Sequence, residues 1–70
     1  MQERYWTGIP PTACQLCSRP LTHLFYDARL PSGSWSIIDH DCYKQAGGQL
    51  GTGLAQRYER TPSGWIKTGG

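Results

Sequence analysis

Three cysteines are the residues of this chain with the clearest chemistry. Cys14 and Cys17 form a Cys-x-x-Cys pair, and Cys42 follows later in the chain. Zn²⁺ prefers tetrahedral sulfur and nitrogen ligands, and a tight turn lets two cysteines three residues apart face one ion. The separation from Cys17 to Cys42 leaves room for two strands that return the chain to that ion. The pattern therefore predicts a single structural zinc with all three cysteines as ligands.

The fourth ligand has three candidates. His40 is favoured, because His and Cys at i and i+2 of an extended segment face the same side and imidazole suits zinc. Asp39 is second, since Asp39-x-x-Cys42 keeps the knuckle spacing with a carboxylate. His23 is third, as a residue of the first predicted strand. The expected metal ligands are therefore Cys14, Cys17, His40 and Cys42.

The cysteines also allow a redox Cys-x-x-Cys or buried inert thiols. A thioredoxin-like site needs a βαβ context, which this short glycine-rich chain does not offer. Three cysteines cannot all pair internally, and no signal peptide opens the chain. No run of about eighteen apolar residues predicts a membrane span. We therefore expect a reducing, cytoplasmic location and no membrane association.

The elements that must position these residues are limited by a thin core. The chain has 70 residues, of which 37% are hydrophobic, and nine glycines. A domain of this size buries only about 60% of the surface that its unfolded chain exposes, so a metal or disulfides usually add stability. Trp6, Trp35 and Trp65, with four tyrosines and Phe25, must supply much of the packing.

Short strands are predicted on both sides of the metal site. Residues 1–12 are expected to form an extended arm, and residues 13–70 a single zinc-binding domain. A helical turn is expected at most over residues 43–46, before a glycine stop. Alternation and turn residues predict two hairpins, with strands within residues 21–30, 35–38, 56–60 and 65–68. The expected fold class is a small zinc-stabilised, mostly β domain, zinc-ribbon- or treble-clef-like, with two β-hairpins around one structural zinc.

A series of motifs runs through residues 13–70. They are Cys14-x-x-Cys17, Phe25-x-Asp27, Gly33-x-Trp35, Cys42, Gly51-Thr-Gly53-Leu-Ala-Gln56-x-Tyr58 and Gly64-Trp65-x-Lys67. In this series the chain resembles a group of small phage and prophage zinc-ribbon proteins of unknown function. The resemblance implies zinc and a phage or bacterial cytoplasmic setting, and no activity. The family pattern has a second Cys-x-x-Cys whose first cysteine falls at Asp39, so Asp39 or His40 substitutes for that ligand here.

One motif suggests an enzyme. Ile38-Asp39-His40-Asp41 is similar to the DH motif of ββα-metal nucleases, in which an Asp holds a metal and a His activates water. Such sites usually add a later Asn or His, and this chain has no asparagine and no histidine after His40. We therefore expect no enzymatic activity.

The C-terminal hairpin suggests a binding surface, because it mixes cations with aromatic rings. The cations and rings are Arg57, Tyr58, Arg60, Trp65 and Lys67, and the polar Gln56 lies beside them. Such mixtures bind single-stranded nucleic acid or form protein hot spots; alternatively, Tyr58 and Trp65 pack in the core and the cations are solvated. A formal charge of +2 does not demand nucleic acid. The sequence favours a non-enzymatic binding module with a protein or nucleoprotein partner; the alternatives are a weak nucleic-acid-binding zinc finger and, third, a degenerate ββα-metal nuclease.

Overall fold

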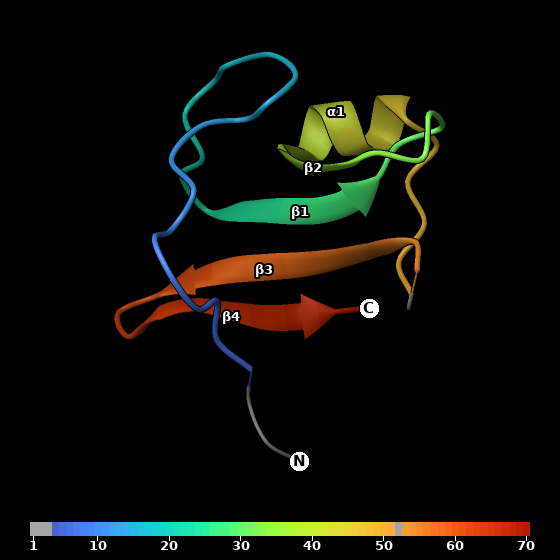
Figure 1. The fold of residues 1–70 in the computed structure, drawn as a ribbon. Coiled ribbons are helices and arrows are strands. Elements are labelled where there is room, and N and C mark those ends of the chain that lie inside the picture. Colours follow the sequence, from blue (N-terminus) through green and yellow to red (C-terminus); the bar gives the residue numbers. More distant parts are fainter. Residues whose placement is uncertain (1–3, 52) are drawn as a thin grey trace.

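The computed structural model of the chain describes residues 4–51 and 53–70. It shows a mostly β domain with one four-stranded antiparallel sheet, in the strand order β2-β1-β3-β4 (Figure 1). The elements are β1 (Leu24–Arg29), β2 (Trp35–Ile38), α1 (His40–Gln45), β3 (Ala55–Thr61) and β4 (Gly64–Gly69). In the described part of the chain, no helix is long and apolar enough to cross a bilayer.

The two predicted hairpins are confirmed as β1–β2 and β3–β4. The first turns where Gly33 adopts φ of +91°, a backbone conformation that favours glycine. In the second, the Thr61 hydroxyl accepts a hydrogen bond from the Ser63 N–H and donates one to the Gly64 carbonyl. The central pairing of β1 with β3 joins the hairpins into a single sheet.

The N-terminal arm adds to this sheet at the free edge of β4. Tyr5 lies opposite Ile66 in an antiparallel bridge. The Trp6 N–H donates to the Trp65 carbonyl at 2.8 Å, and the Lys67 N–H donates to the Arg4 carbonyl. The predicted extended arm, residues 1–12, is therefore confirmed only in part: the segment around Tyr5 pairs with β4, the chain bends at Gly8 and Ile9, and residues 1–3 lie outside the described residues. The paired segment covers an edge that would otherwise present unpaired backbone groups.

The sheet buries a cluster of aromatic rings on the side where the arm crosses. Phe25 is fully buried and stacks on Tyr58 at 5.1 Å between ring centroids. Trp65 meets Phe25 edge to face at 4.9 Å and is only 8% exposed, and Trp6 packs against Phe25 and Tyr58. Tyr58 and Trp65 of the C-terminal hairpin therefore pack in the core, as the alternative interpretation of that hairpin predicted, and their rings do not form an exposed binding surface.

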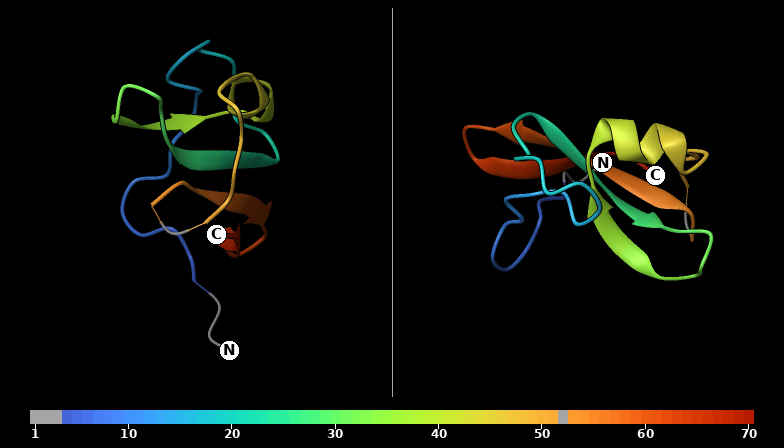
Figure 2. Two further views of the ribbon diagram at one scale, coloured as in Figure 1. Left: turned by 90° about the vertical axis from the view of Figure 1, so that its right-hand side faces the viewer. Right: turned by 90° about the horizontal axis from the view of Figure 1, so that it is seen from above.

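The opposite side of the sheet carries α1, and Figure 2 shows the helix and the arm on different sides. Tyr26 follows Phe25 in β1 and so points to this side. Its ring stacks flat on Tyr43 of α1 at 3.7 Å. The helix ends as predicted at glycine: Gly47 has φ of +86°, and any side chain at Gly48 would collide with the Tyr43 ring. It begins earlier than predicted, at His40.

Candidate metal centre

The Cys14–Cys17 segment is a tight turn attached to the outer edge of β2. The Ser18 N–H donates to the Cys14 carbonyl at 2.9 Å, which closes the turn. Gln15 forms the attachment: its N–H donates to the Ile37 carbonyl, and its side-chain oxygen accepts from the Ile37 N–H, both at 2.8 Å. These two bonds hold the turn beside the end of β2, where the chain enters α1.

Asp39 and Cys42 belong to the start of that helix. Asp39 is the N-cap residue, in an extended conformation, and its Oδ1 accepts the Cys42 N–H at 2.8 Å. Cys42 lies in the first turn of α1 and is buried. The second carboxylate oxygen, Oδ2, faces the thiol of Cys17 at 2.9 Å. The carboxylate thus links the helix cap to the Cys14–Cys17 turn.

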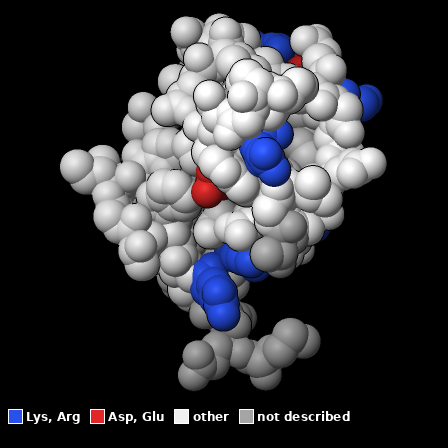
Figure 3. Space-filling view, turned by 45° about the vertical axis from the view of Figure 1, so that its right-hand side comes forward, with Lys and Arg blue, Asp and Glu red and all other residues white. Residues whose placement is uncertain are grey.

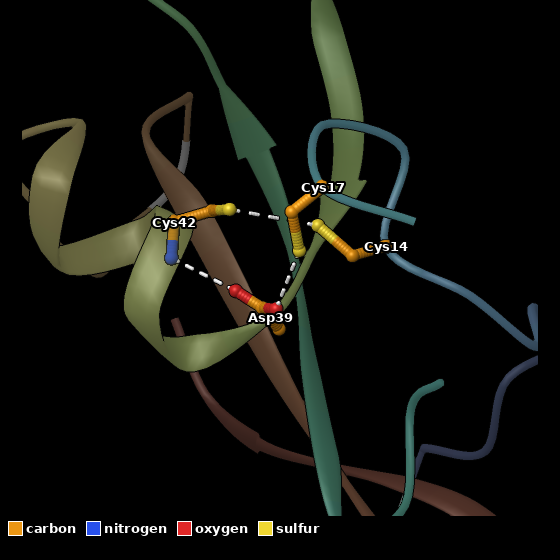
Figure 4. A group of neighbouring side chains, drawn as sticks. All are labelled: Cys14, Cys17, Asp39 and Cys42. Atoms are coloured by element: carbon orange, nitrogen blue, oxygen red, sulfur yellow. Dashed lines mark hydrogen bonds between the residues drawn. The ribbon is translucent and has the colours of Figure 1, made fainter. Parts of the chain in front are cut away.

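The four side chains converge on one point (Figure 4). One ligand atom from each of Cys14, Cys17, Asp39 and Cys42 lies within 4.8 Å of the others, and this group could hold a metal ion. The Cys14 and Cys42 sulfurs are 3.7 Å apart. Two sulfurs bound tetrahedrally to zinc at about 2.3 Å would be about 3.8 Å apart. Both the ligand types and this separation fit Zn²⁺.

The electrostatics of the group also favour a cation. Burial raises the pKa of the Cys14 thiol, but the backbone N–H groups of Cys17, Asp39 and Leu16 together bring that pKa below its ordinary value. Burial raises the pKa of Cys42 to about 12, and the nearby Asp39, Cys14 and Cys17 side chains add to the rise. The group therefore resists carrying several negative charges unless a positive ion shares them.

Arg19 is the positive side chain at the group. Its Nε lies 3.4 Å from both the Cys17 sulfur and Asp39 Oδ2, and its Nη2 pairs with Asp41 at 3.2 Å. Its carbonyl also accepts the Cys14 N–H at 2.9 Å. The side chain is 57% exposed, so a single guanidinium in solvent offsets only part of the negative charge that the four ligands would carry.

The structure brings together the three predicted cysteines but places Asp39, not His40, beside them. The expectation of an extended segment over His40 and Cys42 is wrong, because these residues begin a helix. Residues two apart on a helix point about 200° apart around its axis. His40 is exposed, and its Nδ1 lies 3.0 Å from the Tyr26 hydroxyl instead.

His23, the third candidate, is also outside the group. It is exposed and precedes β1, where its carbonyl accepts the Arg60 N–H at 2.8 Å. The Asp39-His40 pair that resembles a nuclease motif is likewise divided: the carboxylate faces the cysteines, and the imidazole faces Tyr26. Arg19 was not singled out from the sequence; its place two residues after the Cys-x-x-Cys was the available signal.

The chain matches no protein-family model, no curated protein and no solved structure.

Proposed function

We propose that the group formed by Cys14, Cys17, Asp39 and Cys42 holds one structural Zn²⁺ in a treble-clef-like or zinc-ribbon-like domain. The observation that carries the proposal is the convergence of three thiols and one carboxylate within 4.8 Å. The order of elements supports the fold type: a ligand turn, the β1–β2 hairpin, then a helix whose cap and first turn supply the second ligand pair.

A structural role fits the ligand count better than a catalytic one. Four protein ligands complete the tetrahedral coordination of zinc, whereas a catalytic zinc keeps one position for water or substrate. Two of the ligands, Cys14 and Cys42, are buried, so the site is closed on one side by the fold itself. The ion would join the Cys14–Cys17 turn to α1 and add stability that the small core lacks.

Zinc content and metal-dependent folding test this part of the proposal. Native mass spectrometry of the purified protein should show one zinc per chain. Stringent chelation should collapse the dispersion of the amide resonances, and zinc should restore it, because the ligands are organised only in the folded chain. Cys14→Ser, Cys17→Ser and Cys42→Ser should each prevent folding. An unchanged amide spectrum after chelation, with no bound zinc, would contradict the proposal.

We further propose that the domain is a non-enzymatic binding module for a protein partner. Its support is the number of large apolar side chains that remain exposed. Among the described residues they include Leu16 at 52%, Trp35 at 47% and Leu54 at 45% exposure. The phage or prophage setting and the cytoplasmic location rest on the sequence alone. Affinity capture from host cells, with nuclease treatment as control, tests whether a protein partner is retained without nucleic acid.

Weak nucleic-acid binding is the second candidate, and one pair of residues favours it. Trp35 lies directly opposite Arg29 across the β1–β2 hairpin, and both side chains are exposed. A ring beside a cation can stack a base and attract its phosphate. Fluorescence anisotropy with labelled single-stranded oligonucleotides over a salt series, using Trp35→Ala, distinguishes this candidate. Nanomolar binding with a steep salt dependence would place nucleic acid first.

A further inference from the structure

Charged side chains are divided unevenly between the two sides of the sheet. We call the side that the N-terminal arm crosses the arm side, and the side that carries α1 the helix side. Side chains alternate along a strand, so Arg29 points to the arm side with the buried Phe25. Arg60 and Lys67 also point there, because the strand register places them on the side of the Phe25 ring. The Arg60 guanidinium lies 6.0 Å over the ring of Trp65, which in turn meets Phe25.

The arm supplies a fourth cation, Arg4. Trp6, two residues later, packs against Tyr58 on this side. The charge of Arg4 acts on the same ring, since it partly opposes the burial that raises the pKa of Tyr58. Asp27 is the carboxylate of the arm side, and it is half-buried in β1. Among the described residues, the arm side therefore carries four cations and one carboxylate.

The ion pairs between described residues lie elsewhere. Arg57 and Glu59 pair at 4.0 Å on the helix side of β3, and Arg19 pairs with Asp39 and Asp41 at the start of α1. None of the four cations of the arm side forms an ion pair with a residue that the structure describes, and three of them are exposed. Figure 3 views the arm side obliquely and shows an acidic side chain between basic ones. An acidic ligand would therefore meet cations that no carboxylate of the described chain already neutralises.

One end of the arm side also offers apolar surface. Trp35 lies directly opposite Arg29 and is 47% exposed. Ile37 follows two residues later on the same side and is half-buried. A ligand that reaches Arg29 can thus place an apolar side chain against Trp35.

The cations stand far enough apart for an extended segment. Arg29 lies four residues beyond Phe25 along β1, and Lys67 lies two strands away, on the far side of Tyr58. At about 3.4 Å per residue along a strand and about 4.8 Å between strands, the Cα atoms of Arg29 and Lys67 are roughly 17 Å apart. An extended peptide of about five or six residues spans that distance.

We propose that the arm side binds an acidic, extended segment of a partner protein, with carboxylates on Arg29 and Lys67 and an apolar side chain on Trp35. The inference rests on the proposed role as a binding module for a protein, and it adds the surface and the chemistry of the partner. Charge complementarity sets the position and orientation of the segment, and the ring supplies burial.

An acidic peptide fits this side better than single-stranded nucleic acid does. Nucleic-acid sites of that kind stack successive bases on several exposed rings. On the arm side, Phe25 is fully buried, Trp65 is 8% exposed, and Trp6 and Tyr58 pack against them. Among the described rings of this side, only Trp35 is largely exposed.

A library of short random peptides, displayed and selected on the zinc-loaded protein, tests the proposal. Selected peptides should carry two or more Asp or Glu residues and an apolar residue. A selected peptide should shift the amide resonances of Arg29, Trp35 and Lys67 in a titration. Its affinity should fall as salt is added, because salt screens attraction between exposed charges.

Four single substitutions, each checked by its amide spectrum, locate the charges that matter. Arg29→Gln and Lys67→Gln should each weaken binding about three- to tenfold, as expected for one charge-assisted contact that is partly open to solvent. Asp27→Asn should strengthen binding about two- to threefold, because it removes the carboxylate that repels the ligand. Lys44→Gln is the matched control: it makes the same change in net charge, but Lys44 is an exposed residue of α1. It should leave peptide affinity unchanged.

Several outcomes would overturn the inference. They are selected peptides without acidic residues, no selected peptides, resonance shifts confined to the helix side, or a loss of affinity in Lys44→Gln as large as in Arg29→Gln. A single-stranded oligonucleotide that binds more tightly than the selected peptide and shifts the same amides would assign the arm side to nucleic acid instead.

Affinity capture from host cells separates failure of this inference from failure of the proposed function. A protein retained by the wild-type chain and equally by Arg29→Gln and Lys67→Gln would overturn the acidic segment and leave the binding module standing. No retained protein would count against the binding module itself. Zinc is measured on the same samples, so a missing metal is recognised separately.

Discussion

Substitutions at Asp39 and His40 test which residue completes the metal centre. Asp39 has two functions in the structure, since Oδ1 caps α1 and Oδ2 faces Cys17 among the ligand atoms. Asp39→Asn keeps an oxygen that can cap the helix but removes the anionic ligand. Asp39→Ala removes both. His40→Ala removes the contact with the Tyr26 hydroxyl and leaves the group of four untouched.

The expected magnitudes follow from the ligand count. Structural zinc contributes about 10–16 kcal/mol, or roughly 2.5–4 kcal/mol for each of four ligands. At about 1.4 kcal/mol for each factor of ten, Asp39→Asn should weaken zinc binding roughly a hundredfold to a thousandfold. Asp39→Ala should lose about 1 kcal/mol more, for the missing helix cap. His40→Ala should change zinc affinity by no more than about threefold, because a lost surface hydrogen bond is worth about 1 kcal/mol or less.

Competition with a fluorescent zinc chelator measures these affinities. Asp41→Asn is the matched control, because that carboxylate is exposed, pairs with Arg19 and lies outside the group of four. Asp39→Cys should restore tight binding and strengthen the thiolate absorption of the Co²⁺-substituted protein. If His40→Ala weakened zinc binding as strongly as Asp39→Asn, the assignment of Asp39 as the fourth ligand would be refuted.

Three further substitutions have expected results. Arg19→Ala should speed zinc release to a chelator about tenfold in stopped-flow measurements, because Arg19 contacts both Cys17 and Asp39. An unchanged rate would show that these contacts do not stabilise the metal centre. Asp27→Asn should raise the melting temperature at pH 7. Burial raises the pKa of Asp27, so its ionisation disfavours folding as pH rises through that pKa, and the advantage of Asn should shrink toward acidic pH. Trp65→Ala should cost about 3–5 kcal/mol in denaturant unfolding, and a small loss would show that its ring is not part of the core.

The hairpins could be predicted from the sequence because their signals are local. The turn residues around Gly33 and Gly64 stand between apolar and aromatic segments, and the structure turns at both. The Cys-x-x-Cys spacing likewise placed Cys14, Cys17 and Cys42 in one group, as the structure does. The hairpin signals depend on residues close together in the chain, so they do not require knowledge of the packing. Cys42 lies beyond the first hairpin, and it was assigned to the group because zinc needs more than two ligands.

The fourth position of the metal centre depended on a conformation that the sequence leaves open. Residues 39–42 are compatible with a strand end or a helix start, and the two choices turn His40 and Asp39 in different directions. The helix start is stabilised by the Asp39 cap and by stacking of Tyr43 on Tyr26, a contact between distant parts of the chain. The pairing of the arm with β4 is equally nonlocal. Tertiary contacts therefore decided both features.

A final prediction links the metal centre to the position of α1. α1 has only six residues, and an isolated helix of that length is not stable in water. Its attachments are the Asp39 cap, Cys42 in the ligand group and Tyr43 against the sheet, and the first two depend on the metal centre. Tyr43 stacks on Tyr26 of β1 at 3.7 Å between ring centroids. Removing zinc should therefore free α1 from the sheet and separate these two rings.

The amide resonances of Tyr43 and Gly47, followed across a zinc titration, test this link. They should move with zinc occupancy, because the Asp39 cap and Cys42 join α1 to the ligand group. Unchanged resonances without zinc, in protein that stays folded, would show that α1 is held by the Tyr26–Tyr43 stack alone. The metal would then stabilise the domain without holding its helix.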